Sequence, residues 1–336
     1  MRSDRILLAH GSGGTMMREL IEDVFMHGFA DDILARGDDA AALEVPAGRI
    51  AMSTDTYVVS PLFFPGGDIG RLAVCGAVND IATAGATPLY LSVGFILEEG
   101  FMVEDLRKIL VSMHDAAAEA GVRIVTGDTK VVEKGHGDGC YINTAGIGVI
   151  RDGLDLSGSH CKLGDKVLLS GTLGDHGIAV VSTREGLTFE TSIESDAAPL
   201  NHLINAVLDV APDTRCFRDP TRGGLASTLN ELAMASGTSI TVIEDDVPVH
   251  DQVRGASEML GYDVYQVANE GKMVAIVPAA QADAALAAMQ ASPYGEDAAI
   301  VGEVAEGSVG KVYVMTSFGA KRIMDMLVGE QLPRIC

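Results

Sequence analysis

The sequence predicts an α/β protein with mixed sheets, organised as two domains in series. Its 336 residues exceed the about 100–200 of a typical domain, which leaves room for two hydrophobic cores. Hydrophobic residues make up 47% and charged residues 21%, an ordinary composition for a chain that folds. In both halves short apolar runs alternate with segments of helical spacing, and strands that follow one another at hairpin distance favour mixed sheets over purely parallel ones.

The first half begins with an expected N-terminal arm and continues into an N-terminal α/β domain. The arm covers residues 1–40 and carries the glycine-rich stretch HGSGG and a helix at 16–29. The domain covers residues 41–152, with strands expected at 50–54, 90–96, 123–126 and 141–149 and helices at 71–85 and 103–120. The last helix has the clearest signal, because Leu106, Ile109, Leu110 and Met113 recur at helical spacing.

The second half predicts a C-terminal α/β domain at 160–327, reached through a polar linker with glycines at 151–162. A strand at 166–170 leads into the loop SGTLGDHG. Helices are expected at 199–210, 224–236, 253–260 and 279–291, and strands at 238–243, 273–277 and 299–304. Residues 328–336 form a flexible C-terminal tail that ends in Cys336.

Charge and cysteine usage exclude several classes of function. The net charge is −23 and basic residues form no run, so we expect no binding to nucleic acid or to anionic membranes. No apolar stretch reaches the roughly 20 residues of a membrane span, and the N-terminus lacks the apolar core of a signal peptide, which predicts a cytoplasmic protein. Five cysteines without a C-x-x-C pair argue against a disulfide framework and a structural zinc site.

Acidic residues recur where strands are expected to end. Asp55 follows one strand, Asp128 follows another, and Asp38 and Asp39 occupy a glycine turn. Single acids at strand ends are usually solvated turn residues. If these carboxylates converge, their repulsion requires a cation, and Mg²⁺ bridging phosphates suits such hard oxygen ligands. Lys130 would then contact phosphate oxygens as a point charge.

Three other polar positions are candidate site residues. Asn79 and Asp80 lie inside a helix of small apolar residues, where they are either hydrogen-bonded core residues or part of a site. Glu270 precedes an apolar strand and marks either a turn or a carboxylate at the rim of a site. Arg222 precedes a helix whose N-terminus could hold an anion or simply be capped.

Two glycine-rich loops could wrap backbone N–H groups around phosphate. The first contains Gly11, Ser12, Gly13 and Gly14, and the second is SGTLGDHG. Neither matches the P-loop pattern or the dinucleotide-binding fingerprint, so the familiar nucleotide folds are disfavoured. A plain tight turn remains an alternative for the second loop.

The C-terminal tail is long enough to carry Cys336 to a site away from its hinge. Gly329 is a natural hinge, Pro333 favours an extended chain before it, and the seven residues after the hinge span at most about 23–25 Å. An inert frayed tail is the alternative to a working thiol. The adjacent α-carboxylate disfavours the thiolate and Arg334 could offset it, so we expect activation to come mainly from the place where the tail docks.

Motifs along the whole chain resemble the hydrogenase-maturation carbamoyl dehydratases of the HypE type. The motifs are HGSGG, STDTYVV, PLFFPGG, the NDI segment, GFILEEG, VTGDTKVV, SGTLGDHG, RDPTRGG, NEGK and PRIC. The parent superfamily, which includes aminoimidazole ribonucleotide synthetase and selenophosphate synthetase, implies a PurM-like architecture and a homodimer whose N-terminal domains share a β-barrel. It also implies ATP and Mg²⁺ held by acidic and glycine-rich loops.

The same resemblance implies a reaction. Cys336 receives a carbamoyl group from a carbamoyltransferase of the HypF type, ATP activates the carboxamide oxygen, and dehydration leaves a thiocyanate. Cyanide then passes to iron on a scaffold of the HypC–HypD type. Lys130 and Glu270 are the candidate bases. By resemblance, nucleotide and metal roles fall on Asp55, Asn79, Asp80, Asp128 and Lys130, with Asp38 and Asp39 as further metal candidates.

Two other functions fit parts of this pattern. A superfamily sibling would phosphorylate a small molecule, but a soluble substrate needs no carrier thiol such as that of PRIC. A non-catalytic assembly scaffold would use Cys336 only as a metal ligand, and it would bind iron without turning over ATP.

Overall fold

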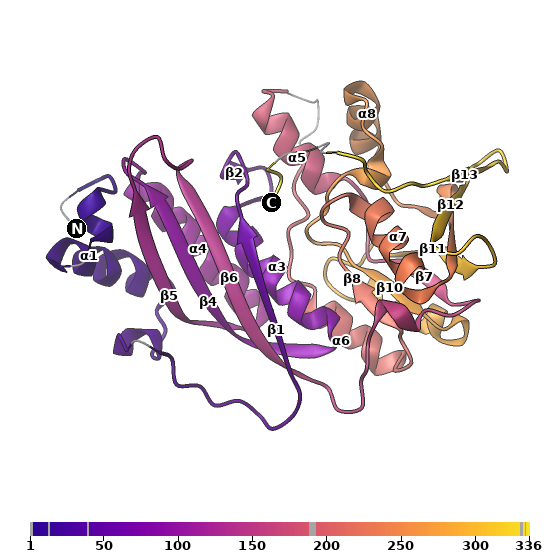
Figure 1. Cartoon of the computed structure of the whole chain (residues 1–336), viewed down its shortest axis with the longest axis horizontal. Coiled ribbons are helices and arrows are strands. Elements are labelled where there is room, and N and C mark those ends of the chain that lie inside the picture. The colour runs from indigo at the N-terminus through magenta and orange to yellow at the C-terminus, as the bar shows by residue number, and fades with distance from the viewer. Residues whose placement is uncertain (1–2, 13, 39, 188–192, 330–331, 333) are drawn as a thin grey trace.

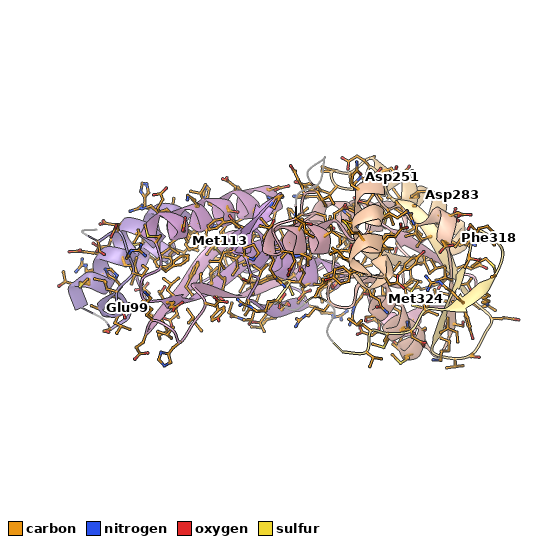
Figure 2. The ribbon with its side chains drawn as sticks, turned by 90° about the horizontal axis from the view of Figure 1, so that it is seen from above. Glu99, Met113, Asp251, Asp283, Phe318 and Met324 are labelled. Atoms are coloured by element: carbon orange, nitrogen blue, oxygen red, sulfur yellow. The ribbon has the colours of Figure 1, made fainter. Side chains whose placement is uncertain are left out.

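The computed structural model describes residues 3–12, 14–38, 40–187, 193–329, 332 and 334–336. It contains two α/β domains in a row (Figure 1). Seen from above, Glu99 of the N-terminal domain and Phe318 of the C-terminal domain lie toward opposite ends of the row (Figure 2). Three residues used in the sequence argument, Gly13, Asp39 and Pro333, lie outside the described residues.

The N-terminal domain is built on a four-stranded sheet in the order β1-β6-β4-β5. Its strands are β1 (Ile50–Tyr57), β4 (Ala86–Glu98), β5 (Arg123–Val132) and β6 (Cys140–Ile150). Only β4 and β5 are parallel, so the predicted mixed sheet is confirmed. Two short strands, β2 (Phe63–Phe64) and β3 (Gly67–Asp68), form a separate hairpin.

Two helices cover one face of this sheet, α3 (Ile69–Thr83) and α4 (Val103–Ala120) (Figure 1). The apolar stripe predicted for α4 is buried at Leu106, Ile109, Leu110 and Met113. The opposite face has no helix over it in Figure 1, and it exposes Ile50, Met52 and Ile96. We call this surface the open face.

The expected N-terminal arm packs onto the N-terminal domain. Its elements are η1 (Leu8–Gly11), α1 (Gly14–Leu20), the π-helical η2 (Ile21–Met26), α2 (His27–Phe29) and η3 (Leu34–Arg36). Ile6, Leu20 and Phe25 are buried in the same core as α3 and α4, and the Phe25 ring lies 5.1 Å from that of Phe95. From η3 the chain runs back along the sheet to β1 at its other edge (Figure 1).

The C-terminal domain is built on a seven-stranded mixed sheet in the order β13-β12-β9-β11-β7-β10-β8. The strands are β7 (Lys166–Leu169), β8 (Cys216–Arg218), β9 (Ser239–Ile243), β10 (Val274–Val277), β11 (Ala299–Ala305), β12 (Lys311–Met315) and β13 (Lys321–Ile323). Successive residues of β7 face two different cores, Val167 and Leu169 on one side and Leu168 on the other. Burial on both faces explains why these strands read as continuous apolar runs.

Helices cover this sheet on both sides, with α7 (Gly224–Ser236) in one core and α6 (Asn201–Val210) and α9 (Ala282–Gln290) in the other. Helices α5 (Asp175–Arg184) and α8 (Asp251–Leu260) pack against each other in a separate small core, and the short turns are η4 (Gly158–His160), η5 (Glu244–Asp246), η6 (Val264–Gln266) and η7 (Ala279–Gln281). Helix α5 is not among the helices predicted from the sequence. Its residues 175–182 are all buried, so no amphipathic pattern marks the helix. Within the described ranges, no helix is both long and apolar enough to cross a membrane.

Candidate active site

A cavity of about 330 Å³ lies between the two domains and contains the last residue of the chain. Strand β1 and helix α3 form its N-terminal wall, and the segment before and within α7 forms its C-terminal wall. It is lined by Thr54, Asp55, Gly76, Asn79, Asp80, Arg218, Asp219, Thr221, Arg222, Ser227, Thr228, Glu231, Glu270 and Cys336. The structure therefore brings six of the predicted site residues together: Asp55, Asn79, Asp80, Arg222, Glu270 and Cys336.

The tail reaches this cavity by extending the end of β1 with backbone hydrogen bonds. The Val58 N–H donates to the Cys336 carbonyl at 3.0 Å, and the Ser60 N–H donates to the Arg334 carbonyl at 3.2 Å. His176, which is buried, lies 2.8 Å from the Ile335 carbonyl through Nε2. Ile335 itself is only 3% exposed. The structure thus shows the end of the tail docked, and the flexibility of the tail stays a prediction.

The docked position holds the Cys336 thiol in its protonated form. Burial raises the pKa of Cys336 to about 12, the carboxylates of Glu270, Asp55 and Asp219 add to the effect, and Arg222 opposes it. Arg334 does not offset them, because its guanidinium donates to the Val58 carbonyl and pairs with Asp138. The expectation that docking activates the thiol is therefore wrong for this conformation.

Asn79 links the two domains beside Cys336. Its side chain, 2% exposed, donates to the carbonyls of Ala198 at 3.0 Å and Glu270 at 3.3 Å, and accepts from the Leu200 N–H at 2.7 Å. All of these partners belong to the C-terminal domain. Asn79 therefore has a structural role that fixes the cavity walls, and it also lines the cavity.

Two carboxyl groups of the cavity, that of half-buried Asp80 and that of buried Glu270, accept no hydrogen bond from a basic side chain of the described residues. Burial raises the pKa of Asp80 to about 6, although the Ser53 hydroxyl donates to its Oδ2 at 2.6 Å. Burial also raises the pKa of Glu270 well above its usual range, with the nearby charges of Asp219 and Asp196 as further causes. Oε1 of Glu270 is buried and makes no hydrogen bond within the described part of the chain.

The NEGK segment explains how Glu270 is aimed into the cavity. Asn269, fully buried, accepts from the Gly174 N–H at 2.7 Å and donates to the Pro220 carbonyl at 3.0 Å, which ties two loops to this segment. Position 271 requires a glycine because the backbone of Asp196 lies against it, and a Cβ at this position would lie 1.7 Å from the Asp196 carbonyl oxygen. Glu270 is thus held between fixed neighbours on both sides.

The donor set fits Mg²⁺ only with help from phosphate. Among the residues that the structure describes, no three His, Cys, Asp or Glu side chains converge to hold a metal ion. Nevertheless Asp55, Asp80, Asp219 and Glu270 line one cavity. Protein-bound Mg²⁺ commonly takes one or two carboxylates, several waters and substrate phosphates, so an incomplete carboxylate set is what a Mg²⁺–phosphate site requires.

Two further predicted residues, Asp128 and Lys130, lie on β5 at the opposite edge of the N-terminal sheet. Asp128 is in register with Gly94, Asn143 and Thr56 across the sheet. Three strand spacings, about 14 Å, therefore separate the backbone of Asp128 from that of Thr56. Lys130 Nζ lies 2.6 Å from both Asp128 carboxylate oxygens, and this hydrogen bond lowers the pKa of Asp128.

The first glycine-rich loop lies beside β5 as well. Gly11 packs so closely on Val131 that a Cβ would lie 2.7 Å from its backbone nitrogen. Ser12 donates to the Leu8 carbonyl at 3.0 Å, and Gly14 opens α1 with φ +75°. Asp38 is exposed in the segment before β1. Within one chain, the structure does not bring these residues to Cys336, and their predicted roles stay predictions.

Three sequence interpretations need correction or extension. Asp55 and Asp128 do not follow their strands, because pairing with β6 and β4 continues β1 and β5 beyond them. The loop SGTLGDHG lines a second inter-domain cavity, of about 740 Å³, with Arg71 and Lys272. Asp219 was missed as a site residue, although the RDPTRGG motif contains it.

Two domain families match the chain: the AIR synthase related protein N-terminal domain at residues 37–150 and the AIR synthase related protein C-terminal domain at 162–315. Carbamoyl dehydratase HypE of Azotobacter vinelandii is 53% identical over the whole chain and 98% of that relative. The chain belongs to the HypE family. This confirms both the resemblance and the PurM-like two-domain fold.

Solved structures of HypE proteins agree with this assignment. A hydrogenase maturation protein HypE crystallised with ATP matches with a TM-score of 0.95 and 48% identity, covering 98% of this chain and 99% of that one. HypE in a HypE–HypF complex matches with a TM-score of 0.81 and 50% identity, covering 92% of this chain and 99% of that one.

Proposed function

We propose that this protein is the ATP-dependent carbamoyl dehydratase of hydrogenase maturation, with Cys336 as the carrier of the reacting group. One observation carries the proposal: the C-terminal thiol is docked inside a carboxylate-lined cavity between the two domains. A relative 53% identical over the whole chain is named carbamoyl dehydratase HypE, which supports the same activity here. An inert tail would have no reason to place its last residue among buried acids.

The proposed substrate is an S-carboxamide formed when a carbamoyl group is transferred to the Cys336 thiol. Dehydration converts the carboxamide and ATP into thiocyanate, ADP, phosphate and one proton. ATP supplies a phosphoryl group that turns the carboxamide oxygen into a leaving group. Both N–H protons must leave the nitrogen, so a base is needed within about 2.6–3.2 Å of it.

Different residues of the cavity are proposed for different roles in this reaction. Glu270 is the candidate base in this cavity: burial and neighbouring acids raise its pKa, so it binds a proton strongly, and positive charge brought by Mg²⁺ and Arg222 would let it ionise before the reaction. One or two of the carboxylates of Asp55, Asp80 and Asp219 would hold Mg²⁺ against phosphate oxygens, and Arg222 would contribute positive charge. Lys130 remains the second candidate base, and it would have to reach the cavity from elsewhere.

A homodimer would account for the separate position of Lys130. The open face exposes Ile50, Met52 and Ile96, and apolar surface of this kind is characteristic of interfaces. We propose that two copies pair through this face and that Asp128, Lys130 and the glycine-rich loop of one copy serve Cys336 of the other. The proposed carbamoyl donor is a HypF-type protein, which the HypE–HypF complex of a relative supports, and the proposed cyanide acceptor is a HypC–HypD-type iron scaffold.

The decisive experiment follows the intact mass of the protein. Carbamoylation should add about 43 Da, and MgATP should then remove about 18 Da, the mass of water. The loss should require ATP and should disappear in Cys336→Ala. Cys161→Ala is the matched control, because it removes a different thiol, buried in the C-terminal domain, and should behave like the wild type.

Other outcomes would favour the other two functions. ATP consumption with a small-molecule acceptor and no change of mass at Cys336 would favour a superfamily sibling. Iron binding that depends on Cys336 but not on ATP would favour an assembly scaffold. Water loss in Cys336→Ala would contradict the carrier role of this thiol.

A further inference from the structure

Tyr57 places a buried hydroxyl directly behind Gly76, a residue that lines the Cys336 cavity. Tyr57 ends β1 and is 1% exposed. Its Oη is buried and has no hydrogen-bond partner within 3.5 Å among the described residues, although the Asp55 carboxylate is near enough to interact with it and raise its pKa. Buried polar atoms in native proteins are nearly always paired, so an unpaired one at a functional cavity needs an explanation.

The neighbouring helix leaves space for this hydroxyl. A Cβ on Gly76 of α3 would lie 2.0 Å from Tyr57 Oη. Gly76 also lines the cavity that holds Cys336. Glycine inside a helix is unfavourable for helix formation, so its presence here is explained by the close approach of the phenol.

Tyr57 is also fixed relative to Cys336 by the backbone. The next residue, Val58, donates its N–H to the Cys336 carbonyl at 3.0 Å. Burial and the negative charge of Asp55 and Glu270 raise the pKa of Tyr57 well above its usual range. The phenol therefore keeps its proton and cannot act as the base, but it can both donate and accept a hydrogen bond.

Two buried oxygens near Cys336, Tyr57 Oη and Glu270 Oε1, make no hydrogen bond with the residues that the structure describes. A carboxamide nitrogen carries two N–H donors in one plane. We propose that Tyr57 is a catalytic residue that accepts a hydrogen bond from one N–H of the carboxamide on Cys336, while Glu270 accepts from the other. The two contacts hold the nitrogen against these two oxygens and turn the carboxamide oxygen toward the phosphoryl donor. This inference rests on the proposed function.

Tyr57→Phe tests the contact, because it removes the hydroxyl and keeps the ring. Carbamoylation of Cys336 and the KM for ATP should stay within about twofold of the wild type, while kcat for water loss should fall about 10–100-fold. The melting temperature should stay the same or rise, because a buried hydroxyl without a partner is lost. A merely structural tyrosine would lower stability and kcat together.

Gly76→Ala provides a second test, so the inference does not depend on Tyr57→Phe alone. Its Cβ should displace the phenol, lowering both kcat and the melting temperature. Adding Tyr57→Phe should recover the melting temperature but not kcat, because the 2.0 Å clash with Oη is gone while the hydroxyl is still missing.

The outcomes separate this inference from the proposed function. Wild-type kcat in Tyr57→Phe would overturn the role of Tyr57 and leave the dehydratase assignment intact. Failure of the carbamoylated wild-type protein to lose water with MgATP would instead overturn the proposed function itself.

Discussion

The two edges of the N-terminal sheet carry different halves of the predicted site. At the β1 edge, Asp55 and Asp80 lie in a cavity with Cys336, and the pKa of Asp80 is raised by burial. At the β5 edge, Asp128 and Lys130 are exposed and paired with each other, and the pKa of Asp128 is lowered. The pKa of an aspartate is thus raised at one edge and lowered at the other.

This difference indicates what each edge lacks. At the β1 edge no basic side chain of the described residues forms a salt bridge with Asp55 or Asp80, and at the β5 edge the hydrogen bonds of the exposed Lys130 within the described part of the chain go to its own strand neighbours. Each edge supplies what the other needs, but about 14 Å of sheet separates them within one chain. A second copy of the chain is the simplest way to bring the two together.

The largest expected effect is complementation between two inactive variants. Lys130→Ala and Cys336→Ala should each be inactive in ATP-dependent water loss. If Lys130 acts across a homodimer, then mixing equal amounts with subunit exchange should restore about one quarter of wild-type activity, because half the dimers are mixed and each has one complete site. Water loss is measured by intact mass after exchange.

Two substitutions at the same edge, both on β5, provide the control for this experiment. Lys130→Ala mixed with Asp128→Ala should stay inactive, because every site then lacks one of the two residues. Recovery in this pair, or no recovery in the Lys130→Ala and Cys336→Ala pair after exchange is verified, would show that Lys130 does not act across an interface.

The next effect concerns the stability of the free protein. Asp80→Asn should raise the free energy of unfolding at pH 7 by on the order of 2 kcal/mol, because the buried carboxylate no longer has to ionise. The native pKa of about 6 lies above the ordinary value of 3.8, so the wild type loses this stability as the pH rises from about 4 to 6. Urea unfolding across this range measures it.

Asp128→Asn is the comparison at the other edge. Asp128 is exposed and its pKa is lowered by Lys130, so its neutralisation should leave stability nearly unchanged or slightly reduced at pH 7. Equal stabilisation by both substitutions would contradict the electrostatic contrast between the two edges.

Much of the fold could be predicted because local patterns and tertiary packing agree. Helix α4 begins and ends as predicted, since its apolar stripe faces one core. Helix α5 could not be predicted, because burial from Asp175 to Ser182 removes the polar face that marks a helix in sequence. Whether this segment forms a helix depends on the residues that pack around it, which is a property of the tertiary structure.

The site could be predicted residue by residue but not as an arrangement. Local sequence marks Asp55 and Asp128 equally well as acids at strand ends. Whether they meet depends on strand order, and β6 and β4 lie between their strands. Likewise, the sequence marks Tyr57 only as an aromatic residue of a strand, and the structure is needed to show that Gly76 lies against its phenol.

The smallest expected effect concerns how the two chain ends are anchored. At the β1 edge, Arg334 pairs with Asp138 and donates to the Val58 carbonyl. Arg334→Ala should weaken docking of the tail and speed alkylation of Cys336 by iodoacetamide several-fold at pH 8, because the undocked thiol escapes the burial that raises its pKa to about 12. Mass spectrometry of the labelled C-terminal peptide measures the rate.

Arg5→Ala is the matched control at the β5 side of the domain. Arg5 likewise anchors a chain end, donating to the Gly100 carbonyl at 2.7 Å, but it forms no hydrogen bond or ion pair with the described residues of the tail. Its removal should leave the alkylation rate of Cys336 unchanged. If both variants speed alkylation equally, then access to Cys336 is governed by opening of the whole protein, and the docked tail is not a separate element that moves by itself.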